Sequence, residues 1–163
     1  MTALPYNSTD GGRQDAITDG EIDARINKGD CVTRAIALAT NTPYAEVYED
    51  IKYLCETEVP VMSRGMSDPN NGVYPELYGP YIDQYFNVTA KAYDEEHLNK
   101  PHLHVSSEDF GTGTFIVEIR RHALAIIDGV IHDSWDSNNK GWRTKRNQCN
   151  GQNCVIRWWK IGE

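Results

Sequence analysis

A short turn motif, Asp128-Gly129, constrains the fold of this chain more than any other feature of its sequence. It separates the runs 122–127 and 130–135, which are rich in aliphatic side chains. Asp-Gly between two such runs is typical of a β-hairpin with a two-residue turn, because both residues tolerate the positive φ angles that this turn needs. The sequence therefore predicts two antiparallel strands joined at this turn.

The turn also fixes which side chains of the hairpin share a face. Partners across the two strands have residue numbers that sum to 257, so position 124 faces 133 and 122 faces 135. Side chains alternate along a strand, so one face is predicted to carry His122, Leu124, Asp133 and Trp135. His132 and Asp136 fall on the other face. His122 and Asp133 are diagonal neighbours, at a separation that their side chains can bridge.

The first third of the chain has helical periodicity instead. Apolar residues recur at spacings of three and four over 31–40 and 43–57, with Asp30 as the expected N-cap of the first helix and Thr42-Pro43 as the start of the second. A short helix is expected over 77–86.

Two further strands are predicted, over 114–121 and from residue 154 to 161. Helices followed by strands give an α+β fold, with N-terminal helices packed on a C-terminal antiparallel sheet.

The domain organisation follows from length and local composition. The 163 residues suffice for one domain. Residues 1–22 are polar, rich in Gly and Asp and without periodicity, so they are predicted to form a mobile arm or a surface strap. Residues 23–163 are predicted to form a single domain.

Charge and cysteine content narrow the classes of function. Residues 1–136 hold ten basic and 23 acidic side chains, which argues against general nucleic-acid binding. Residues 137–160 hold six basic side chains and no acid, which fits either a local contact with an anion or pairing with the acidic body, and we expect the second role. The four scattered cysteines are expected to be thiols. No apolar run is long enough to cross a membrane, so a cytoplasmic protein is expected.

One cysteine occupies a special place. Cys31 falls in the first turn of the helix predicted over 31–40, where unpaired backbone N–H groups and the helix dipole stabilise a thiolate. A lone cysteine at such a place is more often a small buried side chain. The predicted His122 and Asp133 pair supplies what a reactive thiol needs, a base and a carboxylate that orients it. Cys, His and Asp in this order match the triad of papain-like enzymes.

Two stretches resemble known families. "NKGDCVTRAIALATNTPYAEVYEDI" resembles the opening of a group of phage and bacterial proteins, most of them uncharacterised, with a Gly-Asp-Cys-Val-x-Arg-Ala-Ile segment. "RHALAIIDGVIHDSWD" is similar to the His-x-x-x-x-x-Asp-Gly-x-x-x-Asp hairpin of papain-like cysteine peptidases, including those that trim bacteriocin leaders. The resemblance covers about a third of the chain and implies a papain-like fold.

The resemblance implies a catalytic triad of Cys31, His122 and Asp133. It also implies an oxyanion-stabilising side chain upstream of the cysteine. Papain has a Gln about six positions before its cysteine, and Arg25 stands there in this chain, so the nearest amide, Asn27, is the candidate. The implied function is a phage-encoded thiol hydrolase that cleaves an amide bond in a protein or peptide substrate, without a cofactor.

Other functions stay open at the level of sequence. The same triad supports acyl transfer, deamidation or transglutamination. The missing Gln also fits a papain-like scaffold that acts as a binding or inhibitor protein, and the Trp and Tyr residues fit a small-molecule-binding module.

No metal is expected, because His102-x-His104 lacks further ligands nearby. Arg34 is either a substrate clamp or an ion-pair partner, and we expect the second role. Cys55, on an apolar stripe, is expected to be structural.

Overall fold

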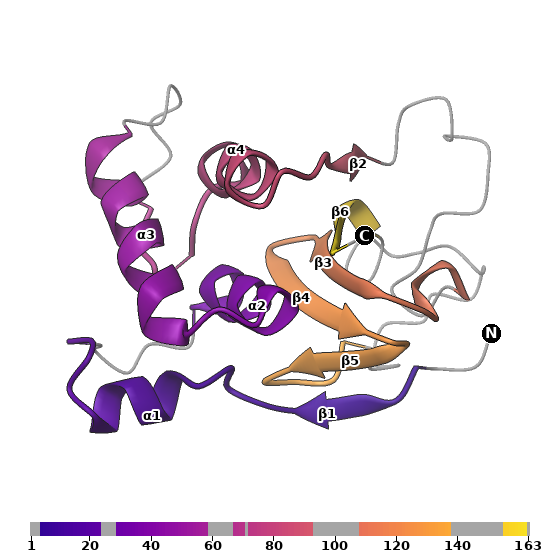
Figure 1. Cartoon of the computed structure of the whole chain (residues 1–163), viewed down its shortest axis with the longest axis horizontal. Coiled ribbons are helices and arrows are strands. Elements are labelled where there is room, and N and C mark those ends of the chain that lie inside the picture. Colours follow the sequence, from indigo (N-terminus) through magenta and orange to yellow (C-terminus); the bar gives the residue numbers. More distant parts are fainter. Residues whose placement is uncertain are drawn as a thin grey trace.

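A computed structural model describes residues 4–23, 29–58, 67–70, 72–92, 108–137 and 155–162. The fold is α+β: a six-stranded sheet in the order β1-β5-β4-β3-β6-β2 carries helices on one face (Figure 1). The strands are β1 (Tyr6–Ser8), β2 (Lys91–Ala92), β3 (Thr114–Ile119), β4 (His122–Ile127), β5 (Val130–Asp133) and β6 (Val155–Ile161). The helices are α1 (Arg13–Thr18), α2 (Cys31–Thr40), α3 (Tyr44–Thr57), α4 (Pro75–Tyr85) and the 3-10 turn η2 (Glu108–Phe110).

The predicted hairpin register is confirmed. Strands β4 and β5 pair Ile127 with Val130 and Ala125 with His132, so their numbers sum to 257. The turn residues Asp128 and Gly129 have φ angles of 46° and 76°, as a two-residue turn with two positive φ angles requires. The neighbouring strands β3 and β4 are also joined by two residues, and the second of these, Arg121, has a φ of 60°.

The sheet differs from the expected antiparallel arrangement in one pair. Strand β1 runs parallel to β5, with Tyr6 beside Ile131 and Ser8 beside Asp133. The other pairs are antiparallel. The sheet is therefore mixed, because its N-terminal edge strand enters from a segment in which no strand was predicted.

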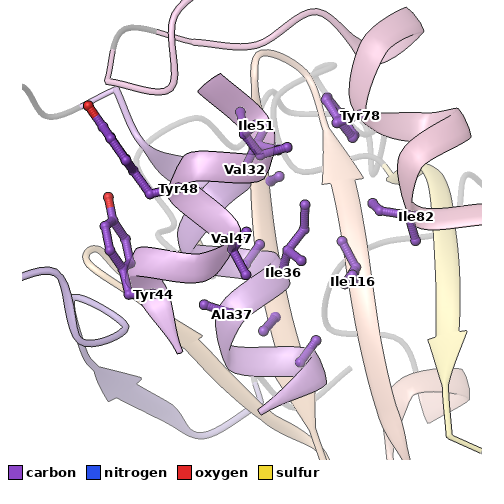
Figure 2. Packing of buried hydrophobic residues seen from close by; sticks show 14 of the residues in the cluster. Val32, Ile36, Ala37, Tyr44, Val47, Tyr48, Ile51, Tyr78, Ile82 and Ile116 are labelled. Carbon is purple, nitrogen blue, oxygen red and sulfur yellow. The ribbon is translucent and has the colours of Figure 1, made fainter. Parts of the chain in front are cut away.

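Alternation along the strands gives the sheet two apolar faces. The face toward the helices carries Ile116, Ala123, Ala125 and Trp159. Small alanines on β4 let α2 lie close to the sheet, where Ile36 and Val47 of α2 and α3 are fully buried (Figure 2). The opposite face carries a second buried cluster: Phe110, Phe115, Val117, Ile119, Leu124, Ile126, Ile131 and Val155.

The helices begin close to the predicted residues, but their caps differ. Helix α2 begins at Cys31 as predicted, yet Asp30 makes no side-chain cap. Its carboxylate is buried and bound to other side chains, which are stronger partners than a backbone N–H. Helix α3 begins at Tyr44, with Pro43 in an extended conformation as its N-cap, one residue later than expected.

The N-terminal segment, expected to be a mobile arm or a surface strap, contains a strand and a helix. Within the described part of residues 1–22, the chain forms β1 and α1, and Ala16 and Ile22 are buried in the core. The pairing of β1 uses backbone groups, which leave no periodic signal in the sequence. Polar composition therefore did not predict these two elements.

In the described residues of the basic C-terminal part, one basic side chain pairs with an acidic residue of the preceding part of the chain. Arg157 of β6 forms an ion pair with Glu118 of β3, and Trp159 is fully buried with its indole N–H donated to Asp83 at 2.8 Å. No helix within the described residues is long and apolar enough to cross a membrane.

We predict that Gly129→Ala destabilises the protein more than Gly20→Ala. Both glycines have positive φ, so both alanines incur about 1–2 kcal/mol of backbone strain. Only at Gly129 would the new Cβ meet a backbone atom, the carbonyl oxygen of Gly111 at 3.1 Å. Urea unfolding should therefore show an additional loss of about 1 kcal/mol for Gly129→Ala. Equal losses would contradict a tightly closed turn.

Candidate active site

Cys31 is the first residue of α2, and its thiol is partly buried where this helix packs on the sheet. The alternation of α2 places Val32, Ala35, Ile36 and Ala39 in the core. The helix start is thereby held against β4, beside the first residues of that strand. This packing places the thiol next to His122.

His122 is the first residue of β4, and only 10% of its side chain is exposed. Its Nε2 atom forms a hydrogen bond with Oδ2 of Asp133. The imidazole also forms a hydrogen bond with the thiol of Cys31. Because Nε2 is occupied by Asp133, Nδ1 is the ring nitrogen left for the sulfur. The imidazole thus connects the thiol to the carboxylate, with Trp135 against its ring at 4.9 Å between centroids.

Strand β5 ends before it reaches the start of β4, and the sulfur of Cys31 lies near the part of β4 that β5 does not cover. The β4–β5 ladder stops at the pair Ala125 and His132, so within the described residues the start of β4 pairs with β3 on one side and has no strand partner on the side of β5. The backbone of Ala123 hydrogen-bonds to Cys31 instead. A backbone N–H that would serve a longer β5 is therefore available to stabilise a thiolate.

Asp133 is buried and accepts four hydrogen bonds. Its Oδ2 atom accepts from His122 and from Ser137 Oγ at 3.2 Å. Its Oδ1 atom accepts from the backbone N–H of Ser134 at 2.7 Å and from Arg34 Nη2 at 3.1 Å. Donors on both oxygens hold this carboxylate in one orientation.

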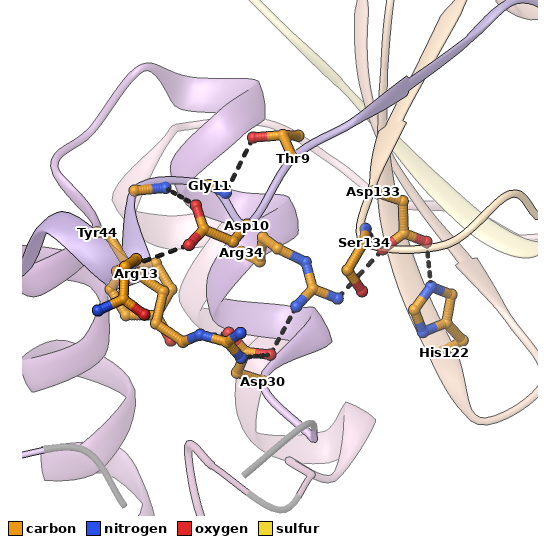
Figure 3. Close-up of polar contacts among 12 residues, drawn as sticks. Thr9, Asp10, Gly11, Arg13, Asp30, Arg34, Tyr44, His122, Asp133 and Ser134 are labelled. Atoms are coloured by element: carbon orange, nitrogen blue, oxygen red, sulfur yellow. Dashed lines mark hydrogen bonds and ion pairs between the residues drawn. The ribbon is translucent and has the colours of Figure 1, made fainter. Parts of the chain in front are cut away.

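Arg34 joins this carboxylate to a second one (Figure 3). Its Nη1 atom lies 2.6 Å from Oδ1 of Asp30, while its Nη2 atom bonds to Asp133. Asp30 also binds Arg13 Nη1 at 3.2 Å and accepts a hydrogen bond of 2.9 Å from the Tyr44 hydroxyl. Both carboxylates and the Arg34 guanidinium are almost fully buried.

These contacts shift the titration of the thiol and the imidazole in opposite directions. Burial raises the pKa of Cys31, but the hydrogen bond and charge of His122, the Ala123 backbone and the charge of Arg34 together lower it below its usual value. Burial lowers the pKa of His122, yet hydrogen bonds to Asp133 and Cys31 outweigh it and raise this pKa to about 9. The arrangement favours a thiolate beside an imidazolium.

The structure brings together three of the four residues proposed from sequence: Cys31, His122 and Asp133. Asn27 and Arg25 lie outside the described residues. The paired histidines His102 and His104 also lie outside them, and the described part of the chain holds no cluster of potential metal ligands. Cys55 is partly buried, and burial raises its pKa to about 11, as suits a structural thiol.

Sequence reasoning missed two groups around Asp133. Arg34 was expected to pair with nearby acids, but its contact with Asp133, 99 residues later, has no local signal. Its other partner, Asp30, lies four residues earlier in the chain and was expected to be the N-cap of α2. Ser137 follows Asp133 by four residues, outside the predicted strand, and nothing in its surroundings marked it.

A comparison with known protein families, curated proteins and solved structures found no match to this chain. The fold and the site therefore rest on the geometry of the chain itself.

We predict that iodoacetamide at pH 6 alkylates Cys31 before Cys55. The thiolate is the reactive form, and the two pKa values lie on opposite sides of the usual thiol value. The difference in rate should be on the order of 100-fold or more. Peptide mass spectrometry after short reaction times reads both cysteines in the same sample, so Cys55 serves as the internal control. Equal rates would contradict an activated Cys31.

Proposed function

We propose that this protein is a papain-like thiol hydrolase that cleaves an amide bond through Cys31, His122 and Asp133. The observation that supports this most directly is the chain of contacts from thiol to imidazole to buried carboxylate. The same chain of contacts activates the nucleophile in enzymes with a Cys-His pair. Cytoplasmic location and a protein or peptide substrate belong to the same proposal.

In the proposed reaction the Cys31 thiolate attacks the carbonyl carbon of the substrate and forms a C–S bond. The carbonyl electrons move to oxygen and give a tetrahedral oxyanion. When the oxyanion collapses, the C–N bond breaks, and Nδ1 of the His122 imidazolium gives its proton to the leaving amine. A thioester between the acyl group and Cys31 remains.

Water completes the cycle. The neutral His122 takes a proton from water as the water oxygen attacks the thioester carbon. Collapse of the second tetrahedral intermediate breaks the C–S bond, which releases the acid and restores the thiolate and imidazolium. Asp133 keeps its charge throughout, since it orients the ring and stabilises the imidazolium.

The oxyanion needs donors near the sulfur. The backbone N–H of Cys31 belongs to the first turn of α2, where N–H groups have no partner within the helix. Asn27 remains the side-chain candidate, and Asn27→Ala is expected to lower the hydrolytic rate.

The first experiment measures hydrolysis of a mixed peptide library by the full chain and its variants. Cys31→Ala should abolish cleavage because no nucleophile remains. His122→Ala should lower kcat/KM by about 10³-fold or more, since the general base and acid is lost. Circular dichroism shows whether each variant is folded, and Cys55→Ala, which removes a thiol outside the site, is the matched control.

The pH dependence provides a second test of the same proposal. Activity requires the imidazolium, so kcat/KM should fall as pH rises above about 9, where His122 loses its proton. At the acid end it should fall as the thiolate becomes protonated. Cleavage that persists in Cys31→Ala, or a library left intact by an alkylation-reactive wild type, would contradict hydrolysis. The second result would favour an acyltransferase or a binding protein.

A further inference from the structure

We propose that Arg34 is a positioning residue of this site, which holds Asp133 in the orientation that His122 needs. This inference rests on the proposed function for its meaning in catalysis. It can be tested on the thiol alone, because it concerns how the imidazole and the sulfur are arranged before any substrate binds.

The first support is that the two carboxylate oxygens of Asp133 bind different partners. Oδ2 faces His122, whereas Oδ1 is bound to Arg34 and to the Ser134 backbone. A carboxylate can rotate about its last bond, and rotation would turn Oδ2 away from the imidazole. Donors on Oδ1 prevent this, and the guanidinium is the charged one among them.

The second support is the way in which Arg34 is itself fixed. Its two Nη atoms bind two different carboxylates, Asp30 and Asp133, and the planar guanidinium holds these two donors at a fixed separation. Asp30 is in turn bound by Arg13 and Tyr44. The guanidinium therefore has little freedom to leave Asp133.

The third support is burial. The Arg34 side chain is 3% exposed, and the N-terminal loop before α1 lies against it. An added Cβ on Gly11, whose φ is 69°, would stand 2.6 Å from Arg34 Cγ. A side chain covered in this way does not reach a substrate, which excludes the substrate-clamp role and leaves an action through Asp133.

Helix α2 thus carries both the nucleophile and the residue that positions Asp133. Cys31 lies at its first residue and Arg34 one turn later, so a single rigid element places the nucleophile and the group that fixes the third member of the triad. His122 and Asp133, on the two strands of the hairpin, are clamped between them. This geometry couples the position of the sulfur to the orientation of the carboxylate.

The test is the alkylation rate of Cys31 at pH 6 in a double-mutant cycle of Arg34→Gln and Asp133→Asn. We expect each single variant to slow alkylation about 10-fold, which corresponds to one pKa unit of lost thiolate. If Arg34 acts through Asp133, adding Arg34→Gln to Asp133→Asn should change the rate less than 3-fold. At a pH high enough to ionise the thiol fully, all variants should react at similar rates.

Lys52→Gln is the matched control. It removes a cation from an exposed ion pair with Glu49 on α3, outside the cluster around Asp30 and Asp133, so the rate at pH 6 should stay within 2-fold of wild type. Arg34→Lys is the second variant if Arg34→Gln does not fold. The lysine ammonium keeps the positive charge but lacks the two fixed Nη donors of the guanidinium. Cys31 of a folded Arg34→Lys variant should therefore be alkylated at least 3-fold more slowly than Cys31 of the wild type.

Two results would overturn the positioning role. One is a folded Arg34→Gln, or in its place a folded Arg34→Lys, that reacts at the wild-type rate at pH 6. The other is full additivity with Asp133→Asn, which would mean that Arg34 acts only by its charge on the sulfur. Neither measurement uses a substrate. A wild type that hydrolyses nothing would therefore refute the proposed function and leave this test intact.

Discussion

The rest of the structure depends on the buried carboxylate of Asp133. Transfer of a charge from water into a protein interior is costly unless it is paired and fully hydrogen-bonded. Four donors from β4, α2 and the turn after β5 meet this requirement. Its backbone carbonyl accepts two more bonds, from the N–H of Thr9 and the hydroxyl of Tyr6. Loss of the contacts from α2 or from the hairpin would leave the carboxylate underbonded, and loss of the N-terminal segment would leave the backbone carbonyl underbonded. Asp133 therefore holds the helix, the hairpin and the N-terminal segment together.

The same feature links stability to chemistry. A buried ion pair such as Arg34 and Asp133 contributes little net stability, but losing one partner is strongly destabilising. In this fold the pair joins α2 to the end of β5, and Cys31 lies beside His122 in this arrangement. The alanines of β4 admit the helix closely, and the ion pair fixes its position along the strand.

Local patterns predicted much of this fold, and long-range polar contacts account for what they missed. The Asp128-Gly129 turn fixed the hairpin register, and with it the contact between His122 and Asp133, because turn chemistry and alternation are local rules. Periodicity likewise located α2 and α3 within a residue at their starts. Strand β1 was missed because parallel pairing through the backbone needs no apolar pattern. Asp30 was assigned to a cap because its partner Arg34 and its neighbour Tyr44 compete for it only once the chain is folded. Asn27 lies outside the described residues and stays a prediction.

The distance along the chain between the parts of this site affects when it can form during synthesis. Arg34 and Asp133 are separated by 99 positions, and Tyr6 and Asp133 by 127. At ~5–20 residues per second, the helix that carries the thiol emerges from a ribosome ~5–20 s before the strands that carry its base and its carboxylate. During that interval the nucleophile has no activating partner. In a nascent chain with this topology the thiol is thus not activated until β4 and β5 have been synthesised, and its reactivity appears together with these two strands.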